Sequence, residues 1–168
     1  MKTLKLNIVI FFFTQFLLSC VNPFAPKLDE SIGSEASLIS DLTNVDGIFQ
    51  NLQYAYTFKD TTIYGSLLAS DFTFSYRDYD REIDDAWGRD SEMRVTYGLF
   101  NNSERLDLIW NKIVAINSDS TNVIRSFNLT ITFNPTDVVY VDGKVNLQLE
   151  KSKENKWQII TWIDESNF

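Results

Sequence analysis

The sequence contains no histidine, a single cysteine and only three prolines among its 168 residues. Histidine is the commonest general base near neutral pH, so its absence excludes catalytic triads that use it, and histidine-rich metal sites as well. A single thiol forms neither a disulfide within the chain nor a cysteine zinc site. Basic residues are also scarce, with 15 Lys and Arg against 23 Asp and Glu. Such an acidic chain is a poor nucleic-acid binder, and we expect no nucleic acid, metal or other cofactor.

A long hydrophobic run is present at the beginning of the chain. Lys2 and Lys5 form a basic start, residues 6–18 are mostly apolar, and the small Ser19 precedes Cys20. This arrangement is typical of a secretory signal peptide. The apolar block has about 13 residues, whereas a transmembrane helix needs roughly 18 or more. We therefore predict a signal peptide at residues 1–19.

The string Leu17-Leu18-Ser19-Cys20 resembles the lipobox of bacterial lipoproteins. The resemblance implies that Cys20 becomes the new N-terminus and carries a diacylglyceryl group, in many bacteria with a further acyl chain such as palmitate. Several acyl chains anchor a protein stably, whereas one chain binds only marginally. Val21 rather than Asp follows the cysteine, which by the sorting rule of enteric bacteria favours the outer over the inner membrane. We expect a lipid-anchored protein of the bacterial cell envelope; a signal peptide that is simply cleaved is the alternative.

Residues 20–42 are predicted to be a flexible tether between the lipidated cysteine and a folded domain at residues 43–168. Pro23 and Pro26 disfavour a helix, and serines are scattered among acidic residues. Such a tether spans roughly 25 Å as a random coil, which would hold the domain clear of a membrane surface.

Helical spacing begins close to residue 44. The apolar residues within 45–56 recur at three- and four-residue intervals, which places them on one face of a helix capped by Thr43 or Asn44. Asp60 can cap a short second helix, and Asp90 can cap a third.

Alternation of apolar and polar side chains predicts strands in the rest of the chain. A short strand covers residues 71–76, a polar loop covers 77–85, and long strands cover 106–116, 123–133, 138–149 and 157–164. Asp142-Gly143 interrupts one of these strands, either as a tight hairpin turn or as a bulge within one long strand. Helices followed by an antiparallel meander indicate an α+β domain with helices packed on one face of the sheet.

The order of these elements and several local strings resemble the nuclear transport factor 2-like superfamily, with its SnoaL-like or cystatin-like cone. The strings are residues 49–56 followed by Asp71-Phe72, then Trp87-Gly88-Arg89-Asp90 with Glu92, and finally Trp157 to Asp164. The resemblance covers about residues 43–166. It implies three N-terminal helices packed on a strongly curved antiparallel sheet, and a bulge rather than a hairpin at Asp142-Gly143. The lipid-anchored bacterial members that it points to have no assigned activity, so it informs the fold more than the function.

The last strand carries large apolar residues at positions of both parities. If Trp157 and Ile159 face the helices, strict alternation turns Ile160 and Trp162 to the opposite face. An apolar second face needs cover from a second copy of the chain, from another protein or from strong curvature. Many proteins that this chain resembles dimerise through the sheet, so we predict a homodimer.

Aromatic residues make up 14% of the chain, and such residues either fill a core or line a ligand pocket. We predict a non-enzymatic lipoprotein whose cone binds a small apolar ligand or an envelope protein. The ligand-binding candidates are Tyr54, Tyr64, Trp110 and Trp162. A structural assembly factor, with a cone filled by its own side chains, is a third interpretation.

The main alternative is an isomerase or dehydratase. In enzymes of the superfamily that the chain resembles, a buried carboxylate acts as base and a tyrosine or carboxylic acid donates to a developing oxyanion. The candidates are Asp71, Asp107 and Asp164 for the carboxylate, and Tyr54, Tyr56, Tyr64 and Tyr97 for the donor. None lies in a recognisable catalytic motif, so no catalytic residue is predicted. Asp71 is expected to be a cap or turn residue, and Asp164 to lie at the exposed end of the last strand.

Overall fold

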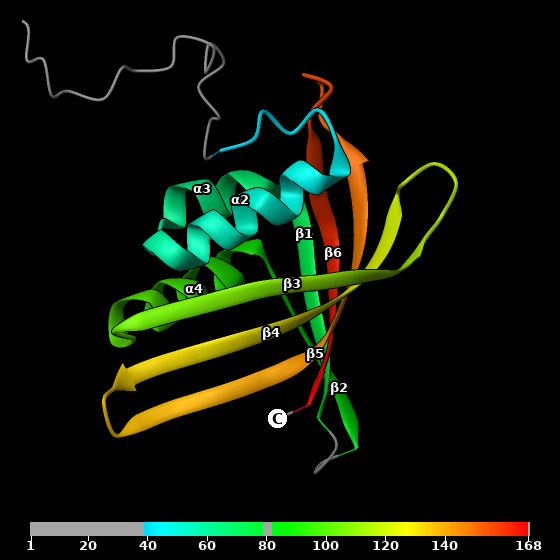
Figure 1. Cartoon of the computed structure of the whole chain (residues 1–168). Helices are drawn as coiled ribbons and strands as arrows, with labels where there is room; N and C mark the ends of the chain where they lie inside the picture. The colour runs from blue at the N-terminus through cyan, green and yellow to red at the C-terminus, as the bar shows by residue number, and fades with distance from the viewer. Residues whose placement is uncertain (1–38, 79–81, 168) are drawn as a thin grey trace, which may run out of the picture. The chain divides into compact units, whose positions relative to one another are not determined.

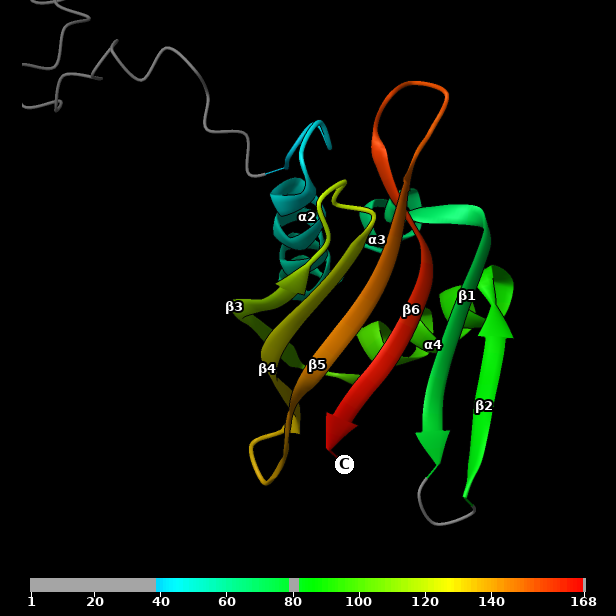
Figure 2. The same cartoon turned by 90° about the vertical axis from the view of Figure 1, so that its right-hand side faces the viewer.

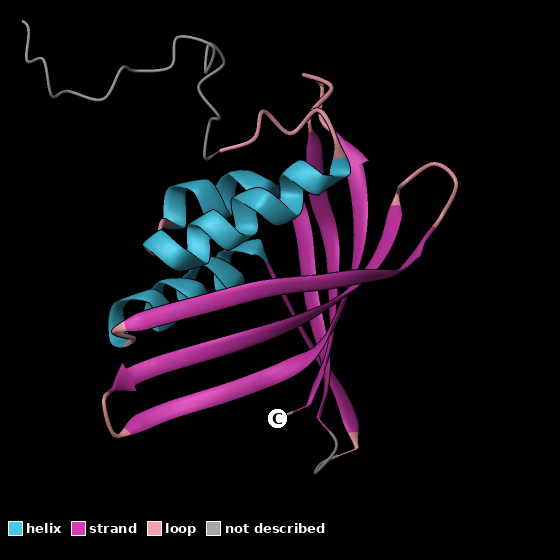
Figure 3. Cartoon of the chain, viewed as in Figure 1, coloured by secondary structure: helices cyan, strands magenta, loops and turns pink. Residues whose placement is uncertain are grey.

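Three helices lie inside the bend of a curved six-stranded sheet (Figure 1, Figure 3). The computed structural model describes residues 39–78 and 82–167. Within these ranges the helices are α2 (Val45–Phe58), α3 (Thr61–Leu67) and α4 (Arg89–Asn102). The helices of the described ranges are all too short or too polar to cross a membrane. The α+β class predicted from the sequence is confirmed.

The strands form one mixed sheet. They are β1 (Leu68–Asp78), β2 (Ile83–Gly88), β3 (Arg105–Ile116), β4 (Asn122–Asn134), β5 (Asp137–Lys151) and β6 (Trp157–Asn167), in the spatial order β2-β1-β6-β5-β4-β3. Figure 2 shows β6 between β1 and β5. Neighbours pair antiparallel, as predicted, except β1 and β6, which run parallel and make the sheet mixed.

Side-chain caps fix where the first two helices begin. The Asn44 side chain accepts a hydrogen bond from the Gly47 backbone N–H at 2.8 Å, and Asp60 accepts from the first turn of α3. Both caps satisfy backbone donors that a helix start leaves without a partner, as the sequence predicts. The third helix differs, because α4 follows Gly88 without a side-chain cap and Asp90 lies inside its first turn. Asp90 there meets the positive end of the helix dipole.

Two sequence predictions about the strands are wrong. The expected loop at residues 77–85 contains the end of β1 and the start of β2, an edge strand whose charged residues hide the alternation. At Asp142-Gly143 the chain makes neither a hairpin nor a bulge, because β5 passes through it with unbroken pairing to both neighbours. Gly143 is required there by a close approach of β6: an added Cβ would lie 2.9 Å from the Glu165 carbonyl oxygen, and closer still to the Cα of Ser166.

A bulge in β6 changes which side chains face the helices. In the pairing with β5, Ile159 lies opposite Leu149 and Thr161 opposite Gln148, so Ile160 is an extra residue on β6. The extra residue shifts the alternation by one position. Ile159 and Trp162 are therefore both buried in the same core, and the prediction that they face opposite sides is wrong. The homodimer remains a prediction, without this argument in its support.

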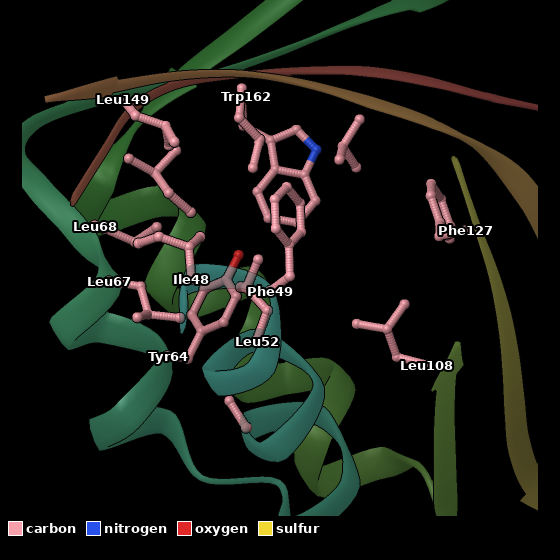
Figure 4. Packing of buried hydrophobic residues seen from close by; sticks show 14 of the residues in the cluster. Ile48, Phe49, Leu52, Tyr64, Leu67, Leu68, Leu108, Phe127, Leu149 and Trp162 are labelled. Carbon is pink, nitrogen blue, oxygen red and sulfur yellow. The ribbon is translucent and has the colours of Figure 1, made fainter. Parts of the chain in front are cut away.

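The core lies between the helices and the inner face of the sheet. Figure 4 shows Ile48, Phe49 and Leu52 of α2 close to Tyr64 and Leu67 of α3. These five side chains are at most 1% exposed. Burying a side chain of this size contributes roughly 1.5–3 kcal/mol relative to an exposed one, so this cluster orients both helices on the sheet.

We expect Gly143→Ala to lower the free energy of unfolding by about 1–3 kcal/mol, because the new methyl group overlaps the backbone of β6. Gly98→Ala on α4 is the matched control, since nothing lies within 4 Å of its added Cβ. In a helix interior this change is expected to stabilise by about 0.5–1 kcal/mol. Urea unfolding of both variants measures the difference, and equal effects would contradict the close approach of β5 and β6.

Candidate functional site

A cavity of about 290 Å³ lies between the inner face of the sheet, α4 and the C-terminal part of α2. All six strands contribute to its lining, which is mostly apolar. Among the described residues that line it there is neither Lys nor Arg. Its polar or partly polar lining residues are Tyr56, Tyr76, Trp87, Glu92, Thr96, Trp110, Trp162, Asp164 and Ser166. The site is therefore an apolar chamber with two carboxylates in its wall.

Aromatic rings form much of the wall. Trp87 of β2 stacks on Phe74 of β1, with ring centroids 4.6 Å apart and planes inclined by 17°. The ring centroid of Trp162 on β6 lies 6.2 Å from that of Phe74. Trp110 of β3 meets Phe127 of β4 edge to face at 6.0 Å, and its indole N–H donates to a backbone carbonyl oxygen of α2 at 2.9 Å. These contacts hold each ring in a fixed orientation around the cavity.

Glu92 is a buried carboxylate held by three neutral donors. It lies in the first turn of α4 and is 5% exposed. Oε1 accepts hydrogen bonds from the Tyr64 hydroxyl at 2.6 Å and the Thr96 hydroxyl at 3.0 Å, and Oε2 accepts from the Trp87 indole N–H at 2.7 Å. Burial, together with this contact, raises the pKa of Tyr64 well above its ordinary value. The network ties α3 and β2 to the start of α4.

Asp164 is the second carboxylate of the cavity. The expectation that it lies at the exposed end of the last strand is wrong, because the bulge at Ile160 turns it inward beside Trp162. The Ser166 hydroxyl donates to Asp164 Oδ2 at 2.8 Å. Burial raises the pKa of Asp164 above its ordinary value of 3.8, because a desolvated carboxylate is harder to ionise.

The indole N–H of Trp162 has no hydrogen-bond acceptor among the described residues. The side chain is 7% exposed and lines the cavity, and Figure 4 shows its nitrogen on the side of the ring that faces Phe127. A buried donor left without a partner costs about 1–3 kcal/mol. Unpaired buried polar groups are uncommon in folded proteins, and one at a cavity wall is a candidate contact for a ligand.

The hydroxyl of Tyr56 is also available to the cavity. Tyr56 lines the cavity from α2, and no described residue forms a hydrogen bond with its hydroxyl. Burial, with the negative charges of Glu92 and Asp164 nearby, raises the pKa of Tyr56. The phenol therefore keeps its proton at neutral pH and acts as a hydrogen-bond donor.

The structure brings together part of the predicted site. Of the four ligand-binding candidates, Trp110 and Trp162 line the cavity. Tyr64 lies behind the wall, where it donates to Glu92, and Tyr54 packs against Phe58 of its own helix with ring centroids 4.5 Å apart. Cys20 lies outside the described residues.

Among the residues named for catalysis, Asp164 and Tyr56 reach the cavity. Asp107 pairs with Arg105 at 2.8 Å on the surface, and Tyr97 is 61% exposed. Asp71 is exposed within β1, and the expectation of a cap or turn is corrected.

Sequence reasoning missed Glu92 and Trp87. Both lie in the string that pointed to the third helix, five positions apart, and that spacing could have suggested a hydrogen bond across the helix start. Within the described ranges, no three Cys, Asp or Glu side chains lie close enough to hold a metal ion.

We expect Asp164→Asn to change how stability depends on pH. The native state holds the Asp164 proton more tightly than the unfolded chain does, so ionisation of this carboxyl lowers stability as pH rises from 3.8 to its raised pKa. Asparagine cannot ionise, and the variant is expected to gain stability relative to the parent over the pH range from 3.8 up to that raised pKa. Urea unfolding across that range measures the effect. Asp71→Asn is the exposed control, and parallel profiles for the two variants would rule out the buried carboxylate as the cause.

No family model and no curated protein matches the chain. Solved structures do match. A putative scytalone dehydratase from Novosphingobium aromaticivorans DSM 12444 has a TM-score of 0.63 at 12% identity, over 74% of this chain and 82% of that chain. A putative SnoaL-like polyketide cyclase from Jannaschia sp. CCS1 has a TM-score of 0.55 at 14% identity, over 76% and 89% of the two chains.

An NTF2-like protein of unknown function from Shewanella baltica OS155 is similar at a TM-score of 0.52 and 14% identity, over 72% of this chain and 89% of that chain. At identities this low, the similarity shows a shared fold only. The chemistry of the cavity has to be inferred from the residues of this chain. The described part of the chain has the nuclear transport factor 2-like fold that its sequence resembles.

Proposed function

We propose that this domain binds one small, largely apolar molecule in its cone cavity, and that the chain is held at the bacterial cell envelope by lipid on Cys20. The observation that carries the binding proposal is the unpaired Trp162 N–H in the wall of an apolar cavity of about 290 Å³. Known ligand pockets run from about 300 to 1,000 Å³, so this cavity suits a ligand at the small end of that range.

Binding explains the composition of the wall better than packing alone. Apolar ligand surface gains about 25 cal/mol for each Å² removed from water, which supplies affinity. The Trp162 indole N–H and the Tyr56 hydroxyl supply direction, because each can donate to an acceptor on the ligand. A structural assembly factor with a filled cone would need neither the cavity nor a buried donor left without a partner.

The hydrogen bonds of Glu92 favour binding over catalysis. A carboxylate facing a tyrosine hydroxyl at hydrogen-bond distance is the arrangement expected of the isomerase or dehydratase alternative. The Tyr64 hydroxyl and Glu92 Oε1 are within that distance, at 2.6 Å. The hydroxyl, however, donates its hydrogen bond to the glutamate, and Tyr64 does not line the cavity. The only proton of the Tyr64 hydroxyl is therefore engaged by Glu92 and is not available to a substrate.

Asp164 supports a second candidate function, that of an isomerase or dehydratase. Its pKa is raised by burial, it lies in the cavity wall with Tyr56, and the matched Novosphingobium protein is named a putative scytalone dehydratase. In an isomerase or dehydratase, the Asp164 carboxylate would remove a proton next to a substrate carbonyl while the Tyr56 hydroxyl donates to the carbonyl oxygen. If the chain converts a carbonyl compound and Asp164→Asn abolishes that conversion, the result would favour this function over simple binding.

We expect native mass spectrometry of the whole chain, purified gently from its own host, to show an added mass of a few hundred daltons. Leu129→Trp, which fills the cavity from β4, is expected to lose that mass. Asn128→Trp is the matched control, because the neighbouring side chain is exposed on the other face of β4. Trp162→Phe keeps most of the ring and removes the donor, so partial loss is expected. Equal ligand content in all four proteins would contradict binding in the cavity.

We expect Cys20→Ser to abolish both acyl labelling and membrane association of the chain, because serine lacks the thiol that takes the lipid. Fractionation of cells that express each protein, with radiolabelled palmitate, measures both properties. Cys20→Ser that stayed with the membrane would rule out the lipid as the anchor. Separation of inner from outer membranes tests the predicted preference for the outer membrane.

A further inference from the structure

The cavity contains negative charge without a positive partner. Glu92 and Asp164 both line it, and no described Lys or Arg forms an ion pair with either carboxylate. The basic residues closest in sequence to Glu92 point elsewhere: the Arg89 guanidinium donates to the Gly65 carbonyl oxygen at 2.9 Å, and that of Arg94 to the Ser91 hydroxyl at 2.9 Å.

The hydrogen-bond partners of Glu92 supply no compensating positive charge. Its three hydrogen-bond donors are two hydroxyls and an indole N–H, all of them uncharged. The positive end of the α4 dipole adds a favourable field at the first turn. A carboxylate can accept about four hydrogen bonds, so these three leave room for one more. A cationic donor within the cavity would complete the set.

The aromatic wall favours the same kind of ligand. Rings of Trp87, Phe74 and Trp162 line one part of the cavity wall, and the faces of such rings attract cations, most strongly when the cation is shielded from water. The unpaired N–H of Trp162 is an independent sign of a ligand, because it needs an acceptor that no described residue provides. The wall thus offers cation-binding carboxylates and rings together with one donor for a ligand oxygen.

We propose that the ligand of this cavity is an organic amine, with a positively charged nitrogen directed at Glu92 and Asp164, a compact apolar body, and an oxygen acceptor for the Trp162 N–H. This inference rests on the proposed function and specifies its ligand class. A carboxylic acid of the same size is disfavoured, because its charge would be repelled by both carboxylates at low effective dielectric. A neutral alcohol would bind through its apolar body alone, with an affinity between those of the amine and the carboxylic acid.

Three probes with one apolar body test the charge preference: 1-adamantanemethylamine, 1-adamantanemethanol and 1-adamantanecarboxylate. Each is titrated calorimetrically into the whole chain at pH 7, in one mild non-ionic detergent throughout, and the heat measured with Leu129→Trp is subtracted. We expect the amine to bind at least about tenfold more tightly than the carboxylate, since opposite and like charges interact strongly in a shielded cavity.

Variants locate the source of the preference. Glu92→Gln and Asp164→Asn are each expected to reduce the ratio of amine to carboxylate affinity severalfold, while the affinity of the alcohol stays within about twofold. Asp164→Asn keeps the test decisive if Glu92→Gln unfolds through loss of its hydrogen-bond network. Glu150→Gln removes an equal charge from the exposed face of β5 and is expected to leave the ratio unchanged.

The outcomes separate the two proposals. Binding of the alcohol together with equal affinities for the amine and the carboxylate would overturn the amine inference and leave the cavity as a binding site. If Glu92→Gln, Asp164→Asn and Glu150→Gln all reduced the preference for the amine equally, the preference would come from the net charge of the protein. That result would also overturn the inference. Failure of all three probes to bind would overturn the proposed function, and the inference with it.

Discussion

The extra residue at Ile160 is the constraint on which the cavity depends. Before it, β6 directs Trp157 and Ile159 into the core; after it, the same face carries Trp162, Asp164 and Ser166. Without the bulge, strict alternation would turn those three side chains to the outer face of the sheet. The cavity would then lose its unpaired indole donor and one of its two carboxylates. A one-residue irregularity in pairing thus decides what the central strand contributes to the site.

The hydrogen bonds around Glu92 organise the other side of the cavity. Tyr64 comes from α3, Trp87 from β2 and Thr96 from α4 itself, so one carboxylate joins the α4 helix to the preceding strand and to a helix 28 positions earlier in the sequence. A buried ionised group is unfavourable unless its hydrogen bonds are made, and here three donors meet it. The network also holds Trp87 in its stack against Phe74. The geometry of the aromatic wall is therefore tied to the charge beside it.

Local signals in the sequence were sufficient for the helices and most strands. The side chains of Asn44 and Asp60 cap backbone N–H groups only two or three residues further along the chain, so a short stretch of sequence is enough to predict them. Two features of the site depend on partners that such a stretch does not contain. The donor from Tyr64 lies 28 positions from Glu92, and the bulge at Ile160 exists only relative to the residues of β5 opposite it. Periodicity within one strand assigned Trp162 to the wrong face for that reason.

The position of β6 in the sheet has a consequence for how this domain is made. Residues 157–167 form a strand that lies between β1, which begins at residue 68, and β5. A nascent chain that lacks those residues has two unjoined halves of a sheet, each with a bare hydrogen-bonding edge. Cooperative closure must therefore follow synthesis of the last strand, and it joins segments distant in sequence, which slows folding. Under the envelope location that we propose, such a late-closing topology would leave the chain unfolded until its whole length has been synthesised.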